Sequence, residues 1–176
     1  IESNYRTQPY RLAIGHSLGG TYVLQDIFKD ESIFSGVIAV SPNLNYDDEQ
    51  IVFSGETYFK THPESHTFIY TSAGDQGSME SSFRRSLQKL DSIHSQLDPK
   101  HMDWTCNLLD GDGHMSSFLP TFNYAYLAFN KHWIISEEQL SAMMNRDYES
   151  MLDHINEFYN ELSLFVGSEV KPTNDD

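Results

Sequence analysis

A serine set between glycines constrains this chain more than any other feature. The motif Gly-His-Ser-Leu-Gly at 15–19 follows an apolar run at 10–14 and precedes a helical pattern at 21–28. A G-x-S-x-G motif between a strand and a helix is typical of a nucleophile elbow, a tight turn that strains the serine backbone and exposes its side chain. Both outer glycines are expected where a Cβ atom would collide with the neighbouring strand or helix. The motif therefore predicts that Ser17 is a nucleophile.

Strand-like and helix-like segments alternate along the first three-quarters of the chain. Short apolar runs rich in β-branched residues are typical of parallel strands buried on both faces. Further strands are expected at 34–40, 66–72 and 102–109, and further helices at 79–97 and 118–133. Residues 44–65 are expected to form a loop with one or two short helices, which either lines a substrate pocket or only connects two strands. This alternation predicts an α/β fold with a doubly wound, mostly parallel sheet.

The chain changes character after Trp133. Ser136 begins a capping-box pattern, and apolar residues then recur at helical spacing to about Val166, with a break near 145–147. We therefore expect residues 1–133 to form the α/β domain and residues 134–176 to form a helical extension with a polar tail. The apolar face of the extension is expected to pack against another surface. Three candidates are open: the α/β domain, a second copy of the chain, or a segment outside this sequence.

Charge and cysteine content exclude several classes of partner. The chain has 11 basic and 26 acidic residues, a formal net charge of -15, which repels nucleic acids and anionic membranes. No apolar run approaches the length that spans a membrane. Cys106 is the single cysteine, so an intramolecular disulfide is impossible, and its apolar setting predicts a buried thiol. These features suit the bacterial cytoplasm and periplasm equally, so the localisation stays open.

A serine nucleophile needs a base to remove its proton and an acid to orient the base. On this type of sheet the three residues follow one another in the order serine, acid, histidine. His114, in a glycine-rich loop after the last strand, is the expected general base for Ser17. Asp75, directly after the third strand, is the preferred acid, and Glu80 is the alternative. Position alone leaves both acids open.

Residues near Ser17 have further expected roles. The N–H of Leu18, at the start of the helix, is expected to donate to the oxyanion formed during attack. His16 and Pro42 are expected to line the substrate pocket. The remaining histidines form no metal-ligating pattern such as H-E-x-x-H, so neither a metal nor a cofactor is expected.

Three motifs give the chain a family resemblance. They are Gly-His-Ser-Leu-Gly-Gly at 15–20, Ser-Pro at 41–42 and Asp-Gly-His-Met-Ser-Ser at 112–117. With these motifs, residues 1–133 resemble the esterase branch of the α/β-hydrolase fold that contains esterase D-like and enterochelin (siderophore) esterase-like proteins. The resemblance implies a serine carboxylesterase that acts through an acyl-enzyme on Ser17, on a siderophore or another small ester, without a cofactor.

Two points in this interpretation stay open. Family members carry the elbow near the middle of the domain, so this chain resembles a C-terminal half that lacks the second oxyanion donor, and we expect weak activity or stability from it alone. An acyltransferase would use the same acyl-enzyme but pass it to an alcohol, and a non-catalytic binding module would keep the fold without the chemistry.

Overall fold

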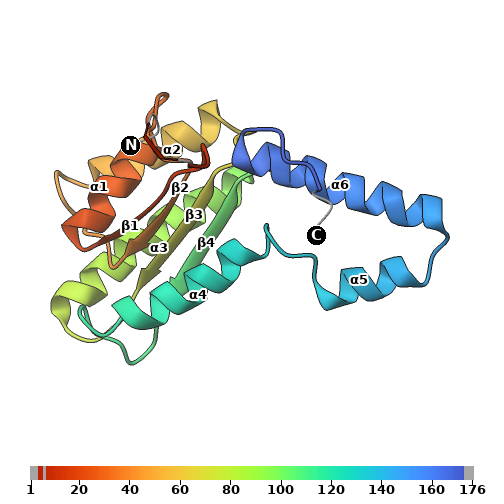
Figure 1. Cartoon of the computed structure of the whole chain (residues 1–176). Coiled ribbons are helices and arrows are strands. Elements are labelled where there is room, and N and C mark those ends of the chain that lie inside the picture. The colour runs from red at the N-terminus through yellow and green to blue at the C-terminus, as the bar shows by residue number, and fades with distance from the viewer. Residues whose placement is uncertain (1–3, 6, 173–176) are drawn as a thin grey trace. The chain divides into compact units, whose positions relative to one another are not determined.

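A computed structural model describes residues 4, 5 and 7–172, and Figure 1 shows the course of the chain. The chain divides into two compact units, Arg11–Ala125 and the combination of Ile1–Tyr10 with Tyr126–Asp176. The second point of division along the chain, between residues 125 and 126, falls within the helix Phe118–Asn130, several residues before the boundary expected at 133. That division at 133 stays a prediction.

Four parallel strands form the sheet of the first unit. They are β1 (Leu12–His16), β2 (Gly36–Val40), β3 (Phe68–Ala73) and β4 (Asp103–Leu108), in the spatial order β1-β2-β3-β4. Both central strands are buried throughout, as their apolar sequences predict for strands covered on two faces. The predicted α/β fold with a parallel sheet is confirmed. Because all four strands run in one direction, their carboxyl ends meet at a single edge of the sheet.

Three helices pack on one face of this sheet and a fourth lies on the other. The first three are α1 (Leu18–Ile27), α2 (Gln50–Thr61) and α3 (Ser78–Leu97). The fourth is α4 (Phe118–Asn130), which contacts the opposite face where Thr121 Oγ1 lies 2.6 Å from Ser72 Oγ. α2 is the helix within the expected loop at 44–65, and its buried side joins the core.

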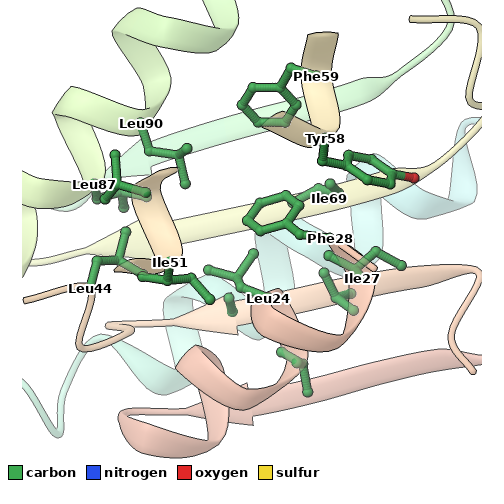
Figure 2. Close-up of a cluster of buried hydrophobic side chains, with 14 of the residues drawn as sticks. Leu24, Ile27, Phe28, Leu44, Ile51, Tyr58, Phe59, Ile69, Leu87 and Leu90 are labelled. Carbon is green, nitrogen blue, oxygen red and sulfur yellow. The ribbon is translucent and has the colours of Figure 1, made fainter. Parts of the chain in front are cut away.

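The core lies between the sheet and the first three helices, as Figure 2 shows. Alternate strand residues such as Val37 and Ile69 point into it, and Leu24 of α1, Phe59 of α2 and Leu90 of α3 meet them from the helices. Each of these five residues is at most 1% exposed. Burying one such apolar side chain stabilises a fold by about 1.5–3 kcal/mol, so this cluster is a main source of stability for the first unit.

The second unit contains α5 (Glu137–Met144) and α6 (Tyr148–Val166). The predicted capping box is present, since Ser136 Oγ accepts from the Gln139 N–H at 3.1 Å and Gln139 Oε1 accepts from the Ser136 N–H at 2.9 Å. Asp147 caps the start of α6, so the predicted break between the two helices is confirmed. Among the described residues, no helix is both long enough and apolar enough to cross a membrane.

Candidate active site

Ser17 occupies the turn between β1 and α1. Its backbone angles are φ 59° and ψ -123°, outside the regions that residues with a side chain ordinarily adopt. The turn is held by two backbone hydrogen bonds, from the Ser17 N–H to the Val40 carbonyl at 2.9 Å and from the Thr21 N–H to the Ser17 carbonyl at 3.0 Å. Such a conformation costs about 1–3 kcal/mol and persists only where surrounding structure enforces it. The strained elbow predicted from the motif is therefore present.

Glycines allow the close approach of strand and helix in this turn. A Cβ atom on Gly15 would lie 2.1 Å from the Gly19 carbonyl oxygen, far inside contact distance. A Cβ atom on Gly20 would lie 3.2 Å from Pro42 Cβ. Gly19 itself has open space around it, with no atom within 4 Å of the Cβ position, so the prediction for Gly19 is wrong. The physical reason is that Gly19 contributes the backbone that excludes a side chain at Gly15.

His114 lies beside the elbow. Its carbonyl oxygen is 2.8 Å from Nε2 of His16, the residue before Ser17, and the two imidazole rings have centroids 4.5 Å apart. Phe118 at the start of α4 also lies against His16, edge to face, with ring centroids 6.0 Å apart. The fold thus brings the loop after β4 to the turn after β1, although 98 residues separate His16 from His114.

The carboxylate at His114 belongs to Glu80, in the first turn of α3. Oε2 of Glu80 lies 2.8 Å from Nδ1 of His114, and the Glu80 side chain is 1% exposed. Its second oxygen, Oε1, accepts hydrogen bonds from Ser41 Oγ at 2.6 Å and from the Gly74 N–H at 2.7 Å. Charged acceptors form stronger hydrogen bonds than neutral ones, so these donors compensate for the burial of a carboxylate.

Asp75, the preferred acid of the sequence analysis, is placed differently. Its Oδ1 accepts from Gln76 Nε2 at 2.7 Å and from the Gly111 N–H at 2.9 Å. The structure therefore pairs His114 with the alternative acid, Glu80. The reason is geometric: the half-buried Asp75 directly follows β3 and bonds Gly111 of the loop, whereas Glu80, in the first turn of α3, is buried against His114 itself.

Comparison with solved structures identifies the fold. An IroE-like serine hydrolase from Shewanella oneidensis matches 99% of this chain at 18% identity with a TM-score of 0.67. A protein from Capnocytophaga ochracea matches 100% of it at 12% identity with a TM-score of 0.73. Siderophore hydrolase EstB from Aspergillus nidulans matches 72% of it at 16% identity with a TM-score of 0.56. The chain therefore has an α/β-hydrolase-type fold.

The match to these α/β-hydrolase structures is partial in length and distant in sequence. This chain covers 54% of the Shewanella structure, 48% of the Capnocytophaga structure and 50% of the Aspergillus structure, so it spans about half the length of each. No protein-family model matches the sequence, and no curated protein matches it. At these identities the comparison shows the fold alone.

The remaining expected site residues of this α/β-hydrolase fold occupy different environments. Leu18 is the first residue of α1, where backbone N–H groups have no partner within the helix, and its side chain is 60% exposed. Pro42 is buried next to Gly20 near the start of α1, and its expected place in the substrate pocket stays a prediction. No group of three or more potential metal ligands occurs in the part of the chain that the structure describes.

Two buried serines belong to the site but were not singled out from the sequence. Ser41 has a positive φ of 43° and, with Ser117, is fully buried. Ser117 Oγ lies 2.8 Å from Ser41 Oγ and 3.1 Å from the His114 carbonyl oxygen. Ser41 thus donates to Glu80, and Ser117 donates to the carbonyl of His114, so the two adjacent hydroxyls contact both residues of the buried pair. Both serines fall inside the motifs that carry the family resemblance, which was the available signal.

Proposed function

We propose that this chain carries the catalytic residues of a serine esterase that hydrolyses a small carboxylic ester through an acyl-enzyme on Ser17. The observation that carries the proposal is the buried contact between His114 and Glu80 beside a strained serine turn. The α/β-hydrolase fold supports the reaction class, because serine, acid and histidine follow one another in the chain order typical of that fold.

In the proposed mechanism His114 is the general base. Its Nδ1–H donates to Glu80, which leaves Nε2 as the nitrogen that accepts the Ser17 proton. Ser17 Oγ attacks the ester carbonyl carbon, and the Leu18 N–H donates to the resulting oxyanion. His114 then protonates the leaving alcohol, so the acyl group stays on Ser17. Water, deprotonated by His114, then attacks the acyl carbon. The bond to Ser17 Oγ breaks, His114 returns the proton to that oxygen and the acid leaves, while the negative charge of Glu80 stabilises each imidazolium.

The proposed substrate is a siderophore or another small carboxylic ester. The Aspergillus nidulans structure with this fold is named a siderophore hydrolase. A siderophore ester is therefore the first substrate to test, beside an activated p-nitrophenyl ester that reports acyl transfer independently of substrate recognition.

The proposal is tested by labelling the chain with a fluorophosphonate, which reacts with activated serines, followed by intact-mass analysis and peptide mapping. Labelling is expected at Ser17 and is expected to disappear in Ser17→Ala and His114→Ala. Ser95→Ala, at an exposed position of α3, is the matched control and should label normally. Labelling that persists in Ser17→Ala, or an unlabelled chain, would contradict the proposal.

A further inference from the structure

Asp75 sits at the expected position of the triad acid but makes contacts of a different kind. Its carboxylate Oδ1 accepts a hydrogen bond from the N–H of Gly111, 36 residues along the chain, at 2.9 Å. Gly111 belongs to the loop that connects β4 to His114. The Asp75 side chain thus holds the loop of the proposed base instead of the base itself.

The backbone beside Asp75 binds the same loop. The N–H groups of Asp75 and Gln76 both donate to the carbonyl oxygen of Asp112, at 2.9 and 3.0 Å. Gln76 and Gly113 also form an isolated parallel bridge. Side-chain and backbone contacts therefore act on consecutive loop residues, and the residue that follows them is His114.

Close packing makes this contact specific. A Cβ atom on Gly74 would lie 2.1 Å from the Asp112 carbonyl oxygen, so the loop rests directly on backbone at this point. Gly74 also donates its N–H to Glu80 Oε1 at 2.7 Å. The segment 74–76 therefore binds Glu80 directly and also binds the loop that precedes His114.

We propose that Asp75 is a positioning residue, which clamps the loop at 110–113 so that Nδ1 of His114 meets Glu80. A second anchor lies on the same loop, where Arg84 Nη2 of α3 is 2.7 Å from Asp110 Oδ1. With the loop held at both places, the imidazole keeps its orientation while its Nε2 accepts and returns a proton. The inference rests on the proposed function for the role of His114, and on the contacts above for the clamp.

The protonation state of Asp75 agrees with a role as an acceptor. Hydrogen bonds from the Gln76 side chain and from the Gly111 N–H lower the pKa of the Asp75 carboxyl. The carboxylate therefore remains an acceptor for Gly111 well into the acidic range. Because Asp75 is only half-buried, solvent screens its charge, and its contribution lies in the position of an acceptor atom.

The test compares Asp75→Asn with Asp75→Ala, because asparagine keeps an oxygen that can accept from the Gly111 N–H. For a clamp, Asp75→Asn should label with fluorophosphonate within about threefold of the unaltered chain, and Asp75→Ala about tenfold more slowly. A triad acid would behave differently, since its amide is typically about as damaging as its removal. Equal large losses in both Asp75 variants, or no loss in either, would overturn the proposal.

A proton NMR measurement separates the clamp from the proposed reaction. The Nδ1 proton of His114, bonded to a buried carboxylate, should give a downfield resonance that disappears in Glu80→Gln. Asp75→Ala should broaden or shift this resonance and speed exchange of the Gly111 amide, while Asp75→Asn should preserve both signals. Intact signals in a chain that does not label would refute the esterase but not the clamp. Signals that are unchanged in Asp75→Ala would refute the clamp.

Discussion

Glu80 and His114 form a buried pair, with Oε2 of the carboxylate 2.8 Å from Nδ1 of the imidazole. The pair joins the first turn of α3 to the loop after β4. Ser41 and Gly74 hold the other carboxylate oxygen, so Glu80 can rotate away from His114 only by breaking two further hydrogen bonds. In the proposed mechanism, the other nitrogen of this imidazole, Nε2, accepts the proton of Ser17.

The first prediction concerns the charge of Glu80. In Glu80→Gln the side chain keeps its size but loses the negative charge that stabilises the imidazolium, so the rate of fluorophosphonate labelling should fall about 10³–10⁴-fold. Glu56→Gln, which alters the ion pair of Glu56 with Lys60 on α2, should label normally. Mass spectrometry measures the labelling rates of the two variants and of the unaltered chain. An unchanged rate in Glu80→Gln would show that Glu80 is not the acid of the proposed triad.

A second prediction concerns the hydroxyl of Ser41. In Ser41→Ala the buried Oε1 of Glu80 loses a donor, which should lower the free energy of unfolding by about 1–3 kcal/mol and also slow labelling. Ser72→Ala is the control, because it removes another fully buried hydroxyl, which bonds Thr121 rather than Glu80. Urea unfolding should detect both changes, whereas labelling should slow in Ser41→Ala alone. Equal labelling in the two variants would show that Ser41 is only structural.

A third prediction compares two glycines of the elbow. Gly15→Ala places a methyl group on the Gly19 backbone, and the resulting overpacking should destabilise the fold by about 1–3 kcal/mol or more. Gly19→Ala places a methyl group in open space within α1 and should stabilise the fold by about 0.5–1 kcal/mol. Thermal unfolding of both variants checks the opposite signs. A Gly15→Ala variant as stable as the unaltered chain would contradict the close approach at the elbow.

A fourth prediction concerns the thiol of Cys106 in β4. Cys106 packs against the core but is only half-buried, not fully buried as its apolar setting predicts, because β4 is an edge strand of the sheet. Burial raises the pKa of this thiol from 9.0 to about 12. The native chain should therefore react very slowly with a disulfide reagent at pH 8, and the urea-unfolded chain should react rapidly. Because the folded pKa is the higher one, the stability linked to the neutral thiol is complete below about pH 9 and is lost as the pH rises toward 12.

Unfolding curves at pH 8 and pH 10 check that linkage, with Cys106→Ala as the control that removes the titrating group. The unaltered chain should lose more stability than Cys106→Ala between these two pH values. A native thiol that reacts as fast as the unfolded one would contradict its burial.

Local sequence was sufficient to predict most of the fold. The strand expected at 66–72 was found at 68–73, and the helix expected at 79–97 was found at 78–97. These elements follow from hydrophobic periodicity and from turn residues, which act over a few neighbours in the chain. Ser17 and the strain of its turn were predictable for the same reason, since the elbow is a local structure formed by its own glycines.

Sequence order also placed an acid after the third strand and a histidine after the fourth, but only the tertiary structure decided between Asp75 and Glu80. Both carboxylates lie within six residues of each other, so no local pattern separates them. Which carboxylate pairs with the histidine depends on contacts with distant residues: Gly111 binds Asp75, whereas His114 and Ser41 bind Glu80. A carboxylate can be buried only where the folded chain brings hydrogen-bond donors to it. The positions of those donors are set by tertiary packing rather than by sequence spacing.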